Sequence, residues 1–507
     1  MQTMMIIDIG TTAVKMSIYD ESLALLRDAT IEYQLITAEN AIAEFDAEDY
    51  WRHLCALAQR LEVSKLQVAG ICVTTQGETL IAVDAAGKPL CNALVWLDGR
   101  AVSQGKKITS VIGTEAFYVA TGIPECNGFC PVSKLLWFKE ERPLLYERTA
   151  YFLLLEDFIL FRLTGRFVTE KSLLTTTGYF HLGEDRVWME LLDLLSLDAS
   201  KIPPALECGE LVGELCKEAM QALGLTQGVC VIAGAMDQVA GAIGAGNIVQ
   251  GIVSETTGTA LCIGATLHKT ALQAGWCVPV YRHFRADRYL ALPVCLTAGM
   301  VLKWFKDLFC EKEQALAKER GCSVYDLLSE AAAASKPLAG GLTLLPYFAG
   351  CVQPEALPAA KGVFYGVTLD TQKKDFVRAI MEGVGYMLRE NVELLTQRLK
   401  VEISEVRSMG GGAKSAVWNG VKANILGKPV ALMRNSECTS AGAAALCATA
   451  LGWYESEAAA CAQANQIADC ILPEAETALL YEQGYQQFRA LYTALRGLFA
   501  KEQGGKQ

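Results

Sequence analysis

Two stretches far apart in the chain share one pattern: a β-rich run, a turn of threonine and glycine, and a second β-rich run. The first stretch, Met4–Asp20, carries the turn Gly10-Thr11-Thr12. The second, Ile252–Gly264, has Thr257, Gly258 and Thr259 at its turn. Such a hairpin turn exposes backbone N–H groups and hydroxyls that can hold phosphate oxygens. Either turn alone also fits an ordinary tight turn, but the pair predicts two related domains that face one nucleotide.

Length and charge narrow the classes of function. A chain of 507 residues is too long for one core and predicts two or three domains. Its net charge of −11 argues against nucleic acid and anionic membrane surfaces as partners. An anionic ligand held by backbone amides and a metal ion remains compatible with that charge.

The cysteines and the apolar segments bear on the compartment. The 18 cysteines are scattered and form no CxxC pair, so they indicate free thiols in a reducing compartment and no zinc site. The first strand begins almost at once, which leaves no room for a signal peptide, and no apolar segment is long enough to span a membrane. We therefore expect a cytoplasmic protein without a membrane or nucleic-acid partner.

An acidic residue follows the buried strand predicted at Val229–Ala235. Asp237 stands at the end of this strand, and a helix of small residues begins near Val239. In open α/β sheets, ligands bind beyond the carboxyl ends of the strands. Aspartate is also a common helix cap. From this stretch alone, a catalytic role and a capping role are equally supported.

Candidate sugar-binding residues lie between the two turns. A strand predicted at Val68–Thr75 ends in a polar run, and an aromatic residue with a nearby carboxylate and guanidinium follows. An aromatic face beside polar groups suits a polyhydroxylated ligand. A core tryptophan with a surface Asp–Arg pair is the alternative. The candidates are Gln76, Gly77, Glu78, Trp96, Asp98 and Arg100.

A third glycine cluster spans Ser408–Ser415 and includes Gly410-Gly411-Gly412. A strand precedes it and a helix at Val417–Leu426 follows, an arrangement that favours close backbone approach to a nucleotide over a flexible linker. Elsewhere, residues 130–170 show helical spacing, and Thr297–Phe305 reads as a helix whose start faces a ligand cleft.

Two longer motifs complete the pattern: Phe129–Glu141, and Gly362–Val367 followed by Asp375–Glu382. With them, the chain resembles the FGGY carbohydrate kinases, the family of xylulokinase, glycerol kinase and gluconokinase, nearly from end to end. The resemblance implies an α/β fold class with two actin-like (ribonuclease H-like) domains flanking an ATP cleft. Residues 1–245 would be the N-terminal domain, with the sugar site, the first phosphate turn and the catalytic Asp, and residues 246–507 the nucleotide-binding C-terminal domain.

The resemblance also implies transfer of the ATP γ-phosphoryl group to a sugar or polyol hydroxyl, with Asp237 as catalytic base. Asp8 lies where it would reach Mg²⁺ through water, so ATP and Mg²⁺ are the expected cofactors. The implied ATP- and phosphate-binding residues are Thr11, Thr12, Lys15, Gly258, Thr259, Gly299, Lys303, Gly411, Gly412 and Ala413. The implied substrate-binding residues are the six candidates above together with Phe129 and Gln238.

The substrate motif is mixed. The run after Thr75 keeps the Glu-Thr of glycerol kinases, but Gly77 replaces their arginine, and the Met-His of xylulokinases is absent. Since Gly77 should leave room, we expect a ketopentose such as xylulose or a related keto-sugar. A glycerol, polyol or gluconate kinase is the alternative within the family, and a non-catalytic sugar or nucleotide sensor is the alternative of another class. A homodimer and a monomer both remain open.

Overall fold

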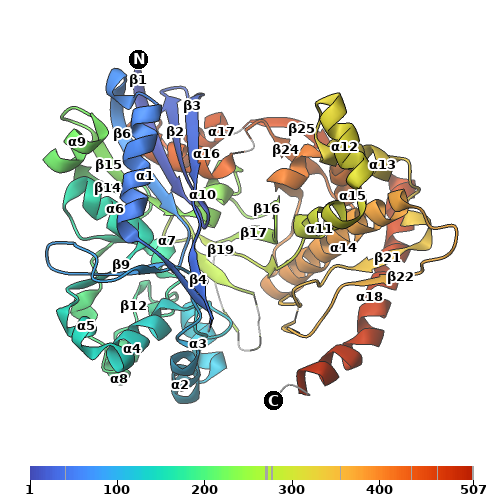
Figure 1. The fold of residues 1–507 in the computed structure, drawn as a ribbon, viewed down its shortest axis with the longest axis horizontal. Coiled ribbons are helices and arrows are strands. Elements are labelled where there is room, and N and C mark those ends of the chain that lie inside the picture. Colours follow the sequence, from blue (N-terminus) through green and yellow to red (C-terminus); the bar gives the residue numbers. More distant parts are fainter. Residues whose placement is uncertain are drawn as a thin grey trace. The chain divides into compact units, whose positions relative to one another are not determined.

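The computed structural model describes residues 1–504 apart from 40, 269–271, 274, 276–277, 354, 436 and 465. The described chain divides into two compact units (Figure 1). The first comprises Met1–Ile248, Leu267–Leu290 and Glu437–Asn465, and the second Val249–Thr266, Ala291–Ser436 and Gln466–Gln507. The first unit thus takes up two segments from beyond residue 245. The predicted boundary at 245 stays a prediction.

A six-stranded sheet forms the centre of the first unit, in the order β14-β15-β6-β1-β2-β3. Strand β1 pairs antiparallel with β2 and parallel with β6, and β6 pairs parallel with β15. The predicted hairpin and both predicted strands are therefore confirmed. The strands are β1 (Gln2–Ile9), β2 (Ala13–Asp20), β3 (Leu25–Glu32), β6 (Gln67–Thr75), β14 (Leu211–Glu214) and β15 (Cys230–Met236).

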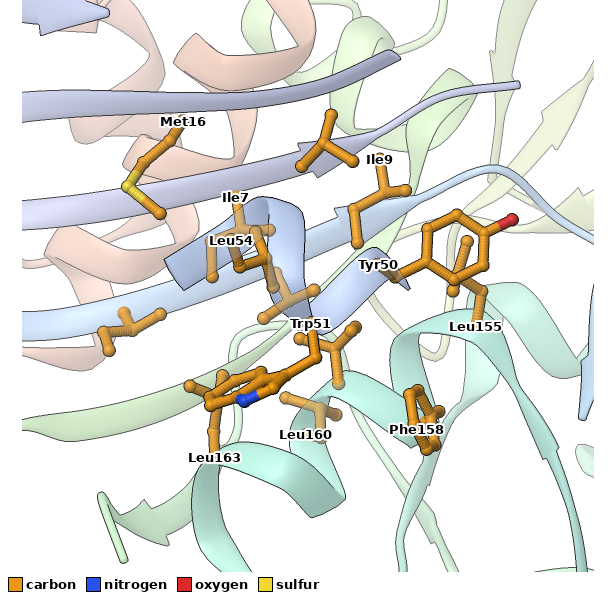
Figure 2. Packing of buried hydrophobic residues seen from close by; sticks show 14 of the residues in the cluster. Ile7, Ile9, Met16, Tyr50, Trp51, Leu54, Leu155, Phe158, Leu160 and Leu163 are labelled. Carbon is orange, nitrogen blue, oxygen red and sulfur yellow. The ribbon is translucent and has the colours of Figure 1, made fainter. Parts of the chain in front are cut away.

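Helices α1 (Ala47–Arg60) and α6 (Leu155–Thr164) pack on one face of this sheet through a common core (Figure 2). Alternate residues of β1, such as Ile7 and Ile9, point into this core, as the period of two in a strand requires. Trp51 of α1 packs there with its neighbours from α6. Each fully buried side chain of this size stabilises the fold by about 1.5–3 kcal/mol.

Helix α10 (Asp237–Gly244) packs against α16 (Cys438–Ala450), which also contacts β1 and β6 (Figure 1). Their backbones touch where both helices have glycine. A Cβ on Gly244 would lie 1.8 Å from the Cys438 carbonyl oxygen, and a Cβ on Gly442 would lie 1.9 Å from that of Ala240. This crossing therefore tolerates no side chain at either glycine.

The first unit also carries a five-stranded sheet in the order β4-β5-β8-β7-β9. The helical spacing of residues 130–170 gave a prediction that is wrong for Tyr151–Leu154, which forms β9, because a short apolar run fits a buried strand as well as a helix. The other elements here include β4 (Ile36–Ala38), β5 (Ile42–Phe45), β7 (Leu80–Val83), β8 (Ala93–Leu94), α2 (Val102–Ile112), α3 (Thr114–Thr121), α4 (Pro131–Glu141), α5 (Pro143–Arg148), α7 (Lys171–Leu174), α8 (Met189–Leu194), α9 (Lys217–Leu223) and α17 (Glu457–Ala464), and the two-stranded pairs β10 (Thr169–Glu170) with β13 (Ala205–Leu206) and β11 (Phe180–His181) with β12 (Arg186–Val187).

The second unit repeats the central arrangement. Strand β16 pairs antiparallel with β17 and parallel with β23, β23 pairs parallel with β24, and β25 closes the edge antiparallel to β24. The expected pair of related α/β units is therefore present. The strands of this arrangement are β16 (Ile252–Thr257), β17 (Leu261–Leu267), β23 (Glu405–Met409), β24 (Val430–Met433) and β25 (Ile467–Ile471), and β20 (Val294–Cys295) pairs with β17.

The helices of the second unit include the two that the sequence predicts at 297–305 and 417–426. They are α11 (Gly299–Phe309), α12 (Glu311–Arg320), α13 (Val324–Ala333), α14 (Lys373–Leu399), α15 (Ala416–Leu426) and α18 (Ala475–Gly504), and the hairpin β21 (Thr343–Leu345) with β22 (Val363–Tyr365) lies beside them. Over the described ranges of both units, no helix has the length and apolar character that crossing a membrane needs.

Candidate active site

The turn between β1 and β2 presents unused backbone donors. The Tyr33 hydroxyl donates to the Gly10 carbonyl oxygen, and the Tyr33 N–H donates to that of Thr12 at 2.8 Å. Within the ranges that the structure describes, the N–H groups of Thr11 and Thr12 donate to no protein acceptor. The turn is therefore held from its carbonyl side, which leaves its N–H side available for an anion.

Two carboxylates stand at the carboxyl ends of parallel strands, Asp8 on β1 and Asp237 after β15. Burial raises the pKa of Asp8 to about 7, and the Asp237 charge contributes. Burial also raises the pKa of Asp237 to about 7, with a contribution from the Glu78 charge. Three carboxylates therefore interact electrostatically at one edge of the sheet. No cluster of three or more His, Cys, Asp or Glu suited to a metal ion occurs among the described residues.

Asp237 is the first residue of α10 and follows its N-cap, Met236. Its Oδ1 accepts the Gln238 N–H at 2.6 Å. Its Oδ2 has no hydrogen-bond partner in the part of the chain that the structure describes. Asp237 therefore satisfies one N–H of the first helical turn and still has one carboxylate oxygen available to a ligand.

Lys15 lies directly opposite Asp8 in the register of β1 and β2. Its Nζ lies 2.5 Å from Oε2 of Glu437, in the segment that returns to the first unit, and 3.9 Å from Oδ2 of Asp28. The Lys15 charge opposes the rise in the pKa of Asp8, and the Glu437 charge adds to it. Lys15 is thus a cation held by carboxylates beside the phosphate-type turn.

Sequence reasoning missed Lys134 as a functional residue. It is fully buried, and its Nζ donates to the carbonyl oxygens of Val95 at 2.9 Å and Glu78 at 3.2 Å. Burial lowers the pKa of Lys134 to about 8, against the charges of Asp98 and Glu78. Its cationic head therefore ties the run after β6 to the strand end that precedes Trp96. A lysine among the buried positions of α4 was the available signal.

The same two segments are joined by Thr79. Its Oγ1 accepts from Gln76 Nε2 at 3.1 Å and from the Trp96 N–H at 3.2 Å. Trp96 in turn donates through Nε1 to Thr11 Oγ1 at 2.8 Å. The structure therefore brings the candidates Gln76, Glu78 and Trp96 together with the first phosphate-type turn.

Asp98 and Arg100 interact chiefly with the protein. Asp98 is fully buried, and its Oδ2 accepts the Ala43 N–H at 2.8 Å. Arg100 donates to both Asp98 oxygens and to Glu44 at 2.5 Å. The sequence left a structural Asp–Arg pair as the alternative to a sugar-binding role, and this geometry resembles such a pair, although it is buried and not on the surface. Nearby, Phe129 is 42% exposed, so its ring is available to a ligand.

Gly77 does not open space along its missing side chain. A Cβ there would lie 3.3 Å from Thr176 and 3.6 Å from Met236 Sδ, at contact distance. The room that we expected from this glycine is therefore occupied by protein in that direction.

In the second unit, the second phosphate-type turn packs against two other glycine positions. A Cβ on Gly299, at the start of α11, would lie 2.5 Å from the Gly258 carbonyl oxygen. A Cβ on Gly412 would lie 2.6 Å from Thr257. Gly299 therefore lies against the Gly258 backbone and Gly412 against the Thr257 side chain, while the Thr259 carbonyl oxygen accepts the Ala298 N–H at 2.9 Å.

The remaining nucleotide candidates differ in their surroundings. A Cβ on Gly411 would meet nothing within 4 Å, so this residue faces open space. The Ala413 carbonyl oxygen accepts from Asn419 Nδ2 at 2.7 Å. Lys303 lies on an exposed face of α11, where its Nζ pairs with Asp307 at 2.7 Å.

A buried ion pair lies behind these turns. Lys422 donates to Glu255 at 2.6 Å, and both side chains are fully buried. Glu255 also accepts from Ser408 and, at 2.7 Å, from Thr257. Because these residues lie on β16, β23 and α15, the pair joins the elements that carry both turns. The sequence offered only a lysine in an apolar helix as a signal.

Comparison with known proteins decides the family. Residues 3–244 match the N-terminal domain of the FGGY family of carbohydrate kinases, and residues 253–451 match its C-terminal domain. The chain belongs to this family. It is therefore an ATP-dependent sugar kinase, an enzyme that transfers a phosphoryl group to an alcohol group of a carbohydrate.

Several FGGY relatives align over nearly the whole chain. Xylulose kinase of Bacillus subtilis is 30% identical over 97% of each chain, and gluconokinase of the same organism is 26% identical over 89% of this chain and 88% of its own. The crystal structure of xylulose kinase from Rhodospirillum rubrum is 26% identical, with a TM-score of 0.87 over 98% of this chain and all of that chain. The predicted actin-like two-domain fold is confirmed.

Proposed function

We propose that this kinase transfers the γ-phosphoryl group of ATP to a hydroxyl of a ketopentose such as xylulose, with Asp237 as general base. The observation that carries the assignment of the base is the Asp237 carboxylate at the end of β15, which has one oxygen available and interacts with the charge of Glu78. The full-length similarity to proteins named xylulose kinase supports the choice of sugar. The gluconokinase relatives support gluconate as the second candidate.

The chemistry suits this carboxylate. A sugar hydroxyl is a weak nucleophile, and a carboxylate within hydrogen-bond reach accepts its proton as the new P–O bond forms. A pKa raised to about 7 makes Asp237 a stronger base than an ordinary carboxylate once it is ionised. Phosphoryl transfer then depends mainly on alignment and on stabilisation of charge.

The edge of the sheet that holds Asp8 and Asp237 fits a divalent cation. Both are hard oxygen donors. Burial and the Asp237 charge disfavour ionisation of Asp8, an effect that a cation would relieve. Asp8 would hold Mg²⁺ through a water molecule. When bound, Mg²⁺ would neutralise charge on the phosphates of ATP.

The other assignments are proposals as well. Thr11, Thr12 and Lys15 would bind phosphate, as would Gly258 and Thr259. Gly299, Lys303, Gly411, Gly412 and Ala413 would bind the remainder of the nucleotide. Gln76, Gly77, Glu78, Trp96, Asp98, Arg100, Phe129 and Gln238 would line the sugar site.

The roles of the two domains, the cellular compartment and the oligomeric state are proposals too. Residues 1–245 would form the sugar-binding domain and 246–507 the nucleotide-binding domain. The free thiols of the described cysteines support a reducing, cytoplasmic setting. Light scattering of the purified protein would separate a homodimer from a monomer.

An ADP-release assay tests the proposal. We expect ADP release to depend on Mg²⁺ and to be fastest with a ketopentose among ketopentoses, ketohexoses, gluconate and glycerol. Asp237→Ala should nearly abolish it. Faster turnover of gluconate would favour the second candidate, and an Asp237→Ala enzyme as fast as wild type would remove Asp237 from its role. Binding of sugar and ATP that raises the melting temperature without turnover would instead indicate a sensor.

A further inference from the structure

The last residues of β15 before Asp237 are held by side chains on their outer edge. Strand β14 pairs with β15 only as far as Ile232 in the described structure. From Gly234 to Met236, the edge away from β6 therefore depends on acceptors from other elements. Those acceptors come from α6 and α7.

A β-bulge lies at the centre of this segment. Ala233 pairs with Val73 of β6 and Ala235 pairs with Thr74, so Gly234 is the extra residue. A Cβ there would lie 1.8 Å from the Val73 carbonyl oxygen, which only glycine avoids. The extra residue of a bulge is left unpaired by the ladder, and a one-residue change of register reverses the faces of the residues that follow.

Glu156 accepts the N–H of the extra residue in the bulge. Its Oε1 accepts the Gly234 N–H at 2.8 Å, and the side chain is fully buried on α6. Its Oε2 has no partner among the described residues. Burial and the neighbouring charge of Glu170 raise the pKa of Glu156 well above its ordinary value. A glutamine at this position would therefore resemble the neutral form of the acid.

Ser172 satisfies the next outward N–H. Its Oγ accepts the Met236 N–H at 2.9 Å and donates to Glu170 Oε2 at 2.6 Å. Glu170 also accepts the backbone N–H groups of Ser172 and Leu173, which fixes it at the start of α7. The hydroxyl is therefore oriented by a residue that is itself held by two backbone N–H groups.

We infer that Glu156 and Ser172 are positioning residues for phosphoryl transfer, because they hold the bulged end of β15 and so set the place of Asp237. The inference rests on the proposed role of Asp237. Loss of either acceptor leaves a buried N–H without a partner unless the segment moves. A displacement of about 1 Å at a catalytic group costs on the order of 100-fold in rate.

The test uses full-length variants and steady-state kinetics with ATP and the best sugar from the ADP-release assay. Ser172→Ala should lower kcat by about 10- to 100-fold and leave the KM values for sugar and ATP within about twofold. Glu156→Leu should lower kcat in the same way. Glu156→Gln keeps an acceptor for the Gly234 N–H and should restore most of that kcat.

Thr121→Val is the matched control. The Thr121 hydroxyl is buried, donates to the Phe117 carbonyl oxygen at 2.8 Å and accepts the Ile123 N–H at 3.1 Å, away from β15. It should lower the melting temperature about as much as Ser172→Ala does, with an unchanged kcat.

Equal effects of Ser172→Ala and Thr121→Val on kcat would overturn the inference, and so would a Glu156→Gln enzyme as slow as Glu156→Leu. If Glu156→Leu fails to fold, the comparison of Ser172→Ala with Thr121→Val decides alone. Wild-type turnover in Asp237→Ala would instead mark failure of the proposed function, so the two failures are distinguishable.

Discussion

At the scale of single residues, buried polar groups hold the segments that carry the candidate site. Lys134, Glu156 and Ser172 each satisfy backbone groups of segments that carry candidate site residues. Buried polar groups of this kind are costly unless they are fully paired. Their loss should therefore change the geometry of the site as well as the stability of the fold.

Lys134 provides one test. Lys134→Met keeps an unbranched side chain that ends at the position of Cε, but leaves the carbonyl oxygens of Val95 and Glu78 without this donor. We expect a loss of about 1–3 kcal/mol in the free energy of unfolding and a higher KM for the sugar. Urea denaturation and steady-state kinetics measure the two effects. Lys107→Met removes an exposed pair with Glu140 and should change stability by less than about 1 kcal/mol. A wild-type KM for sugar in Lys134→Met would contradict a role of this lysine in positioning the candidate sugar-binding residues.

His283 gives a prediction for the pH dependence of the stability. It is buried, accepts the Phe284 N–H at Nδ1 and lies 3.1 Å from the Asn247 carbonyl oxygen through Nε2, so it is neutral with its proton on Nε2. Burial lowers its pKa from 6.5 to about 4. Between these pH values His283 is protonated in the unfolded chain and neutral in the folded chain. The free energy of unfolding is therefore unaffected by this histidine above pH 6.5 and falls as the pH drops toward 4.

Protonation of His283 in the unfolded chain should lower the free energy of unfolding by about 3 kcal/mol at pH 4 relative to pH 7. In His283→Gln, the free energy of unfolding should be lower at pH 7 but fall less between pH 6.5 and pH 4 than in wild type. Urea titrations at several pH values measure this. If the free energy of unfolding fell equally with pH in both proteins, the acid sensitivity would belong to groups other than His283.

At the scale of elements, the sequence predicted the strands and hairpins that a short-range pattern of residues encodes. Alternating apolar residues around Gly10-Thr11-Thr12 and around Gly258 were sufficient for both hairpins, and the run before Asp237 was sufficient for β15. The bulge at Gly234 and the partners of its N–H were out of reach, because they depend on α6 and α7, far away in the chain. Asp98 stays a predicted ligand residue, and one partner of its carboxylate, the Ala43 N–H, likewise comes from far away in the chain.

The crossing of α10 and α16 gives an element-scale prediction. Gly442→Ala would place a methyl group against the Ala240 carbonyl oxygen, on the helix that begins with Asp237. We expect a loss of about 1–3 kcal/mol, from overpacking, together with a lower kcat. Gly420→Ala on α15 is the control, since its Cβ would meet nothing within 4 Å and should stabilise the helix by about 1 kcal/mol. Thermal unfolding that is unchanged in Gly442→Ala would show that the helices can separate at no cost.

At the scale of the whole molecule, the duplication was the most reliable inference from sequence. Two similar turns predicted two related units, and the strand order around β1 and around β16 is the same. The return of 437–465 to the first unit had no local signal, because α16 is a small-residue helix whose partner is decided by close packing. Even so, that segment supplies Glu437 to Lys15 beside the first turn.

The glycine-rich turn of the second unit allows nucleotide binding to be separated from folding. A methyl group at Gly412 would press on Thr257, whereas one at Gly411 would project into open space. Gly412→Ala should therefore lower the melting temperature of the free protein, and Gly411→Ala should leave it unchanged. If the nucleotide lies against this turn, Gly411→Ala should weaken ADP binding and reduce the stabilisation of about 2.7 kcal/mol that ADP at 100 times its Kd gives wild type. Calorimetric titration with ADP and thermal unfolding measure the two quantities. Undiminished ADP affinity in Gly411→Ala would move the nucleotide site away from this turn, because the added methyl group would project into the open space beside the Gly411 backbone.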